Sequence, residues 1–419
     1  MPNDIVQLAL PMNIVHLTKQ AQSTVDIVAK KTLALRLETP GRREQISNSV
    51  SNDESEPKSS ATRLLSLDVF RGLTILGMLL VNNMALDTAT PRQFTHAAWD
   101  QGVHFADLVF PWFLLIVGVA IPYAFASHIR KGASTRNFLL KAIRRTVSLI
   151  LLGCFVDSSV ARHLSIGMGV LQLIGLAYFT AVLIYQLPTR LRAITAFALL
   201  TAHWAVIRFV PMPGSSAGVF LESKNIIQYL NQTYLQHYHL NGIISVVPTT
   251  ALVLIGTAAG DLLRAATVIP SRKVAYLCVG GLILSFVGWL WNLDLSFNKS
   301  VWTASYILYA AGFGSAILGL LYMLIDVKGH QRWAFPLAIL GANAIMAYIL
   351  PIAVKVYVLQ GWSWSMPDGS SLSMQQAVLQ LLTGYTGRVC GGWLYTIGYI
   401  VFWWLIFYQF YRKKIFLRV

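Results

Sequence analysis

The stretch HAAWDQGVHFADLVFPWFLLIVGVAI, from His96 to Ile121, begins with polar and titratable side chains and continues as uninterrupted apolar sequence. With the residues that follow, its apolar part reaches about 20 residues, the length that crosses the hydrocarbon core of a bilayer as an α-helix. Similar apolar runs recur along the 419-residue chain. The pattern predicts an all-α, polytopic membrane protein with a group of polar residues at the mouth of one spanning helix.

The composition agrees with this fold class. Hydrophobic residues make up 55% of the chain and charged residues 12%, whereas soluble domains carry about 25% charged residues. We expect an N-terminal extension over 1–62, disordered or amphipathic, followed by a transmembrane domain over 63–419. The apolar runs predict about ten spanning helices, near 64–84, 105–126, 142–158, 167–187, 193–210, 242–262, 274–292, 302–325, 335–354 and 391–411. The stretch 373–385 is too short to span and is expected to lie at the interface or to re-enter.

The net charge of +16 reflects membrane topology rather than nucleic-acid binding. Residues 1–60 are balanced in charge, so the excess lies in the short connections between the apolar runs. Alternate connections hold 17 Lys and Arg residues, against 6 in the opposite set. By the positive-inside rule the first set is cytoplasmic. Both termini are therefore predicted to be cytoplasmic, and His96 to lie on the external side.

Several kinds of chemistry lack a motif in this chain. The three cysteines lie within or beside apolar runs, with no metal or redox spacing. No H-E-x-x-H, C-x-x-C, G-x-S-x-G or glycine-rich phosphate loop occurs. We therefore predict no bound metal. No convincing internal repeat of the kind common in transporters is found.

The first predicted span carries polar residues at both ends. Asp68 and Arg71 open it, and their i,i+3 spacing places them on one helical face, where they form either a structural ion pair or part of a polar entrance. Asn82 and Asn83 close it on the external side, where an asparagine often only caps a helix.

The opening stretch supplies further candidates. His96 can act as a base, as a nucleophile or as an ordinary loop residue, and His104 is its rival. Trp99 is either an interface anchor or a binding residue. Asp107 either caps the helix that it begins or orients a nearby histidine. Spacing alone leaves these alternatives open.

Blocks of this sequence resemble the heparan-α-glucosaminide N-acetyltransferase family, in the bacterial form that lacks the large luminal domain. The blocks that carry the resemblance are SLDVFRGLTI (66–75), VNN (81–83), HAAWDQGVHFADLVFPWFLLIVG (96–118), GVLQLIGLAYF (169–179), NGIISVVPTTALVLIGTAAG (241–260), NKSVWTASYIL (298–308), LLYMLIDVKG (320–329) and LGANAIMAYIL (340–350). They keep the family's order over about 63–350. The chain departs from the family at Leu173, where relatives commonly carry arginine, and at Asn241, in place of a glutamate.

The resemblance implies acetyl transfer across the membrane, from cytosolic acetyl-CoA as co-substrate to the amine of a glucosamine-like sugar outside. It identifies His96 with the active-site histidine and Asn82 with an asparagine that can hydrogen-bond the developing oxyanion. Beside them, Asp107 would orient the imidazole. Trp99 and Asn298 would bind the sugar, and Arg71 with Asp68 would bind the coenzyme. Lys299 is either part of the sugar site or an ordinary interface lysine. Direct transfer and an acyl-histidine intermediate both remain open.

Two other activities remain as alternatives. An amino-sugar permease would move the sugar without CoA, and an O-acetyltransferase would modify a hydroxyl group of an envelope glycan. The expected location is the bacterial inner membrane, as a multi-pass protein. The expected partners are acetyl-CoA, an amino-sugar acceptor and the lipid bilayer, with a homodimer as a further candidate and nucleic acid excluded.

Overall fold

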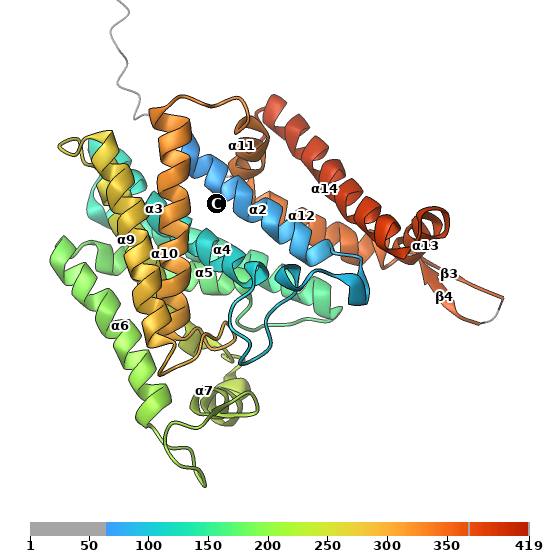
Figure 1. The fold of residues 1–419 in the computed structure, drawn as a ribbon, viewed down its shortest axis with the longest axis horizontal. Helices are drawn as coiled ribbons and strands as arrows, with labels where there is room; N and C mark the ends of the chain where they lie inside the picture. The colour runs from blue at the N-terminus through green and yellow to red at the C-terminus, as the bar shows by residue number, and fades with distance from the viewer. Residues whose placement is uncertain (1–63, 368, 418–419) are drawn as a thin grey trace, which may run out of the picture. The chain divides into compact units, whose positions relative to one another are not determined.

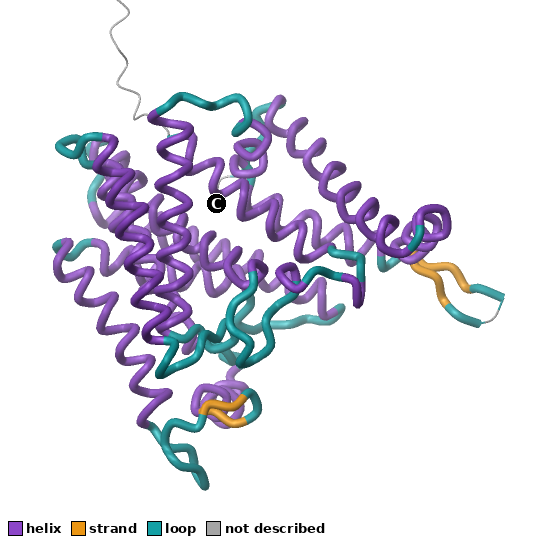
Figure 2. Tube along the Cα trace, in the orientation of Figure 1, coloured by secondary structure: helices purple, strands orange, loops and turns teal. Residues whose placement is uncertain are grey.

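The computed structural model describes residues 64–367 and 369–417, and nearly all of its regular structure is helical (Figure 1). The predicted extension 1–62 lies outside the described residues. Figure 2 shows that the loops gather mainly at the ends of the long helices, as expected where polar connections leave a membrane. The predicted all-α, polytopic membrane fold is confirmed.

The elements follow one another along the chain without a large sheet. The α-helices are α2 (Leu65–Asn83), α3 (Phe105–Arg130), α4 (Thr135–Ala161), α5 (Val170–Tyr185), α6 (Thr189–Phe209), α7 (Ile226–Leu230), α8 (Val246–Arg264), α9 (Pro270–Trp291), α10 (Ala304–Leu321), α11 (Phe335–Ala342), α12 (Ala344–Val354), α13 (Met374–Thr386) and α14 (Arg388–Arg412). The 3₁₀ turns are η1 (Asp87–Ala89), η2 (Arg92–Phe94), η4 (Gln236–Tyr238) and η5 (Ile243–Ser245). The π-helical segments are η3 (Asn231–Leu235), η6 (Tyr322–Val327) and η7 (Lys355–Leu359). Two antiparallel hairpins pair β1 (Phe220–Leu221) with β2 (Lys224–Asn225) and β3 (Ser363–Ser365) with β4 (Ser371–Ser373).

Seven of the described helices are long and apolar enough to cross a membrane, and a bent pair can supply an eighth. The seven are α2, α3, α6, η5 with α8, α9, α10 with η6, and α14. Two other predicted spans form helices of a different character. The helix α4 carries a cluster of cations in its first half, and α5 has only 16 residues. The predicted count of ten spans and the side of the termini stay predictions.

The predicted helix 335–354 is broken at Asn343, although the bent pair together is long and apolar enough to be one span. The helices α11 and α12 meet there at an angle of 77°. Asn343 has the non-helical backbone angles φ −124° and ψ 38°. Its side-chain amide donates to the backbone oxygen of Ile415, 3.1 Å away, and its amide oxygen accepts from the backbone of Leu417 at 3.4 Å. The side chain of Asn343 therefore hydrogen-bonds to the C-terminal segment at the point where the helix is interrupted.

Glycines let the helices approach each other closely. A Cβ atom at Gly72 of α2 would lie 1.8 Å from the backbone oxygen of Leu337 in α11. A Cβ at Gly118 of α3 would lie 2.1 Å from the backbone oxygen of Val253 in α8. Such contacts hold membrane helices together through dispersion forces where water supplies no hydrophobic driving force. The pairs α2 with α11 and α3 with α8 are therefore fixed by backbone proximity.

This packing sets the position of the polar mouth. The C-terminal half of α2 lies against the start of α3, because Gly77 faces the side chains of Phe105 and Val109. The end of α2 and the beginning of α3 therefore lie at the same end of the helix bundle. The loop 84–104, which carries the candidate residues His96 and Trp99, connects them there.

Candidate active site

Asp107 is fixed at the N-terminus of α3 before any other candidate is considered. Its Oδ2 accepts hydrogen bonds from the backbone N–H of Ala97 at 3.0 Å and of His104 at 3.1 Å. Only 3% of its side chain is exposed. A carboxylate suits this position because the exposed amides of a helix start carry partial positive charge. The predicted cap is therefore present, and it ties loop 84–104 to the helix.

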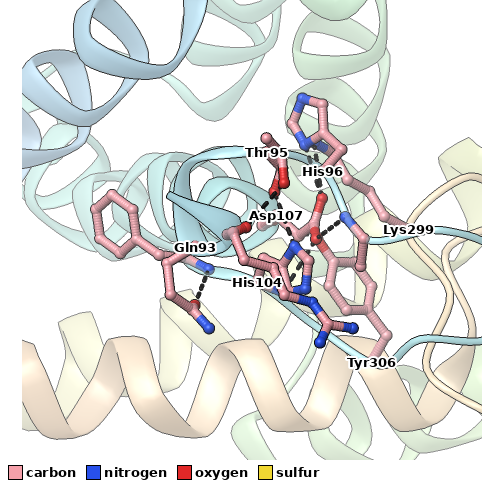
Figure 3. A network of polar contacts seen from close by, with 10 residues as sticks. Gln93, Thr95, His96, His104, Asp107, Lys299 and Tyr306 are labelled. Atoms are coloured by element: carbon pink, nitrogen blue, oxygen red, sulfur yellow. Dashed lines mark hydrogen bonds and ion pairs between the residues drawn. The ribbon is translucent and has the colours of Figure 1, made fainter. Parts of the chain in front are cut away.

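The other oxygen of the same carboxylate meets His96. The Oδ1 atom of Asp107 lies 2.8 Å from Nδ1 of His96 (Figure 3). An ionised carboxylate only accepts hydrogen bonds, so Nδ1 carries the proton and Nε2 keeps a free lone pair. The His96 side chain is 55% exposed. The imidazole is therefore half-exposed, and a buried carboxylate holds it at the Nδ1 edge of the ring.

Lys299 brings a cation to this pair from a distant part of the sequence. Its Nζ lies 3.5 Å from Asp107 Oδ1 and 3.1 Å from His96 Nδ1. Because a protonated Nδ1 and an ammonium are both donors, the contact with Asp107 is the attractive one. Burial lowers the pKa of Lys299, and the negative charge of Asp107 opposes that shift.

Two buried residues after α9 brace this arrangement. The hydroxyl of Tyr306 in α10 donates to the backbone oxygen of Asp107. The amide of Asn298 donates to the backbone oxygen of Trp99 at 2.9 Å, and its own oxygen accepts from the backbone of Val301 at 3.2 Å. The structure therefore places Asn298 in a bracing role, with both side-chain groups engaged inside the protein.

The predicted sugar-side residues line one pocket of about 240 Å³. Its walls include His96, Trp99, Asp107, Asn298 and Lys299, so five of the eight predicted site residues come together. The indole N–H of Trp99 donates to the backbone oxygen of Phe220, 3.2 Å away, and the two rings lie 5.0 Å apart. Trp99 is thereby held at the pocket wall.

The rival histidine has a different place. His104 is buried, and its Nδ1 lies 3.0 Å from the backbone oxygen of Thr95. It precedes α3 as the cap residue, and Figure 3 shows it on the side of Asp107 away from His96. The geometry therefore separates the two candidates, with His96 presented to the pocket and His104 used in loop packing.

Asn82 lies elsewhere than the sequence reading suggests. It lines a second pocket, of about 340 Å³, together with Asn83, Lys355 and Gln360. This pocket shares no lining residue with the one at His96. The structure therefore does not bring Asn82 into the His96 pocket, although both stand at the same end of the bundle.

Asp68 and Arg71 form the ion pair that their spacing predicts, with 3.2 Å between Oδ1 and Nη1. The strongest cation cluster lies in another place. A cleft of about 560 Å³ between α3 and α4 is lined by His128, Lys131, Lys141, Arg144 and Arg145, among others. The sequence signal for this cleft is the run of cations in 127–145, one of the basic loops that, together with Arg71, were expected to attract the CoA phosphates.

A second cavity adjoins the cleft inside the bundle. Arg145 lines both the cleft and a narrow apolar cavity of about 30 Å³, and its guanidinium lies 4.5 Å above the Tyr178 ring. Met78 and Tyr348 line that cavity and also the Asn82 pocket. Three cavities thus follow one another from the basic cleft to the end of α2, each sharing a wall with the next.

Fold and site together define a class. This is a polytopic helical membrane protein with a hydrogen-bonded histidine–carboxylate pair. Such pairs occur in enzymes that transfer protons or acyl groups. No group of three or more His, Cys, Asp or Glu residues that could hold a metal ion is found in the part of the chain that the structure describes.

Comparison with known proteins gives the family. The profile described as heparan-alpha-glucosaminide N-acetyltransferase, catalytic, matches residues 63–288. The chain is 26% identical to the heparan-alpha-glucosaminide N-acetyltransferase of Mus musculus over 430 residues, covering 86% of this chain and 61% of the relative. It is 26% identical to the Homo sapiens protein of the same name over 450 residues, with 91% and 64% covered. The chain belongs to the heparan-α-glucosaminide N-acetyltransferase family, which confirms the predicted resemblance. It spans less than two thirds of the length of these curated relatives.

Proposed function

We propose that this protein is a transmembrane acetyltransferase that moves an acetyl group from cytosolic acetyl-CoA to the amine of an amino sugar on the external side. The observation that carries the proposal is the hydrogen bond between His96 and the buried carboxylate of Asp107, which leaves Nε2 free on a side chain that lines a pocket. Membership of an N-acetyltransferase family supports the reaction type.

The chemistry needs a base because an ammonium group has no lone pair with which to attack. The Nε2 atom of His96 takes one proton from the acceptor ammonium, and the neutral amine nitrogen then bonds to the carbonyl carbon of the thioester. The carbon–sulfur bond breaks, CoA leaves as a thiolate, and the second proton of the new amide nitrogen passes to that thiolate. The charge of Asp107 stabilises the imidazolium that forms. Lys299, as a neighbouring cation, favours the neutral form of the incoming amine.

A second route uses the same groups. The Nε2 lone pair of His96 attacks the thioester first, and CoA thiolate leaves and takes a proton from the acceptor ammonium. The neutral amine then takes the acetyl group from the acetyl-imidazole, and the surplus proton of the amide nitrogen passes to the released Nε2. In both routes the proton on Nδ1 stays hydrogen-bonded to Asp107.

The donor's phosphates suit the basic cleft between α3 and α4. Lys131, Lys141 and Arg144 offer the charge-assisted hydrogen bonds that phosphate groups require. The positive-inside rule assigns this end of the bundle to the cytoplasm, where acetyl-CoA is found. The cleft supplements the Arg71–Asp68 pair that the sequence proposed for this role.

The acceptor suits the pocket at His96. Trp99 contributes an apolar wall of the kind that packs on sugar rings, and Lys299 contributes a donor. We propose a glucosamine-like monosaccharide or a terminal amino sugar of a larger glycan as the acceptor class.

The test uses full-length protein in liposomes, with labelled acetyl-CoA outside and glucosamine inside, or the reverse. We expect N-acetylglucosamine to form in the wild type and to be lost in His96→Ala. His163→Ala is the matched control, because His163 is an exposed loop histidine. Full activity of His96→Ala would exclude the assigned role. Sugar uptake without CoA would indicate the permease, and an ester product in place of an amide would indicate O-acetylation.

A further inference from the structure

Lys355 occupies an unusual position at the end of α2. Its Nζ donates a 2.7 Å hydrogen bond to the backbone oxygen of Asn82. It is half-buried and begins the π-helical segment η7, four residues after Pro351. π-Helical turns cost stability and occur frequently at functional sites. The position of Lys355 at the start of a π-helical segment therefore makes it a candidate functional residue.

Lys355 takes part in none of the ion pairs formed among residues 64–367 and 369–417. Tyr348 is the other titratable side chain that lines its pocket. A lysine that only stabilised the C-terminal carbonyls of α2 would explain the bond to Asn82, but it would not need a cavity of about 340 Å³ beside it.

The pocket is the last of three adjoining cavities. It follows the narrow apolar cavity, which in turn follows the basic cleft, and these three cavities share Arg145, Met78 and Tyr348 as walls. CoA has the same order of chemistry, with phosphates at one end, a slender arm, and the thioester at the other end. A donor with its phosphates in the cleft would therefore place its thioester near Lys355.

We propose, building on the proposed function, that this pocket receives the thioester end of the acetyl donor and that the Lys355 ammonium hydrogen-bonds its carbonyl oxygen. An ammonium has three N–H donors, and the bond to Asn82 uses one of them. When the amine nitrogen bonds to the carbonyl carbon, the oxygen gains negative charge that the remaining donors stabilise. The carbonyl re-forms as the carbon–sulfur bond breaks, and CoA departs as a thiolate. Lys355 forms no covalent bond.

The two pockets then have separate tasks. The donor's reactive end lies at Lys355 and Asn82, and the acceptor lies at His96. Both stand where α2 ends and α3 begins, since Gly77 packs on Phe105 and Val109. Transfer therefore requires the acetyl group and the amine to come together across the space between the two pockets at this end of the bundle.

The experiment measures acetyl transfer by full-length Lys355→Met and Lys355→Arg in liposomes. We expect Lys355→Met to lower kcat by about 100- to 1,000-fold, the range for removal of one donor to a developing oxyanion, with KM for acetyl-CoA little changed. Lys131→Met, in the basic cleft, is the matched control and should raise KM while kcat is kept. Lys355→Arg should keep activity within about 10-fold of the wild type, because arginine retains the charge.

The pH profile separates this role from a structural one. A lysine ordinarily loses its proton near pH 10.4, whereas arginine stays charged. The alkaline fall in kcat should therefore move to higher pH in Lys355→Arg and stay in place in Tyr348→Phe.

An unchanged kcat in Lys355→Met, or an alkaline limb that Lys355→Arg does not move, would overturn the proposal for Lys355 while leaving the acetyltransferase intact. If Lys355→Met does not fold, the Lys355→Arg profile decides. Absence of transfer by the wild type would instead reject the proposed function, and the assignment of Lys355 with it.

Discussion

His96 Nδ1 lies 2.8 Å from Asp107 Oδ1, yet the two side chains differ widely in exposure, at 55% and 3%. The carboxylate is fixed first, because two backbone N–H groups hold its other oxygen at the start of α3. The exposed imidazole is then oriented by a rigid partner. An exposed loop residue thereby gains a defined tautomer, which a base or nucleophile needs.

Replacing Asp107 by Asn tests this orientation. The amide oxygen would accept the backbone N–H groups of Ala97 and His104, so its NH₂ group would face His96 and force the proton onto Nε2. We expect acetyl transfer to fall by about 10³- to 10⁴-fold, as when a catalytic histidine is held in the wrong tautomer. Kinetics with saturating acetyl-CoA measure this, with Asp100→Asn in the same loop as the control. A loss below about tenfold would contradict the assigned tautomer.

Lys299 makes stability depend on alkaline pH. Burial lowers its pKa below the ordinary value of 10.5, so between the two values the unfolded chain binds more protons at this site. The free energy of unfolding should therefore rise with pH across that window, by at most about 1.4 kcal/mol per pH unit. Thermal unfolding in detergent should show this contribution in the wild type and not in Lys299→Met. Lys224→Met, at an exposed lysine, should follow the wild type, and identical curves for all three proteins would refute the expectation.

The native cysteine Cys390 allows the predicted topology to be tested without introducing another cysteine. It is exposed at the beginning of α14, whereas Cys154 and Cys278 are partly buried. A membrane-impermeant thiol reagent should label it from the external face of oriented vesicles. In a Cys390→Ser background, Ser134→Cys at the start of α4 should be labelled only from the opposite face. Labelling of both positions from one face would reverse or reject the topology.

A pair of neighbouring glycines in α9 tests the helix packing. A Cβ at Gly281 would lie 2.6 Å from the backbone oxygen of Gly312 in α10, whereas a Cβ at Gly280 would meet nothing within 4 Å. We expect Gly281→Ala to destabilise the protein by about 1–3 kcal/mol, the usual range for overpacking. Gly280→Ala should be neutral or mildly stabilising, because alanine favours the helix. Equal melting temperatures for the two variants would show that α9 and α10 do not pack this closely.

The local parts of the site were predictable from sequence. His96 and Asp107 are 11 residues apart around one helix start, so the capping preference of a carboxylate and the short loop bring them together. The ion pair of Asp68 with Arg71 follows from i,i+3 spacing alone. The sequence did not predict that Asn82 lines a separate pocket, because the position of Asn82 depends on how α2 and α12 pack.

The apolar runs by themselves determined that this chain folds as a bundle of membrane helices, since backbone groups in lipid must bond within each helix. Only the tertiary structure decided that Lys299 joins the His96–Asp107 pair, that a predicted helix is broken at Asn343, and that Arg145 lines both the basic cleft and an interior cavity. These features depend on contacts between helices far apart in sequence. Hydropathy indicates which segments lie within the membrane. The close approach of helix backbones decides which residues of different helices face one another.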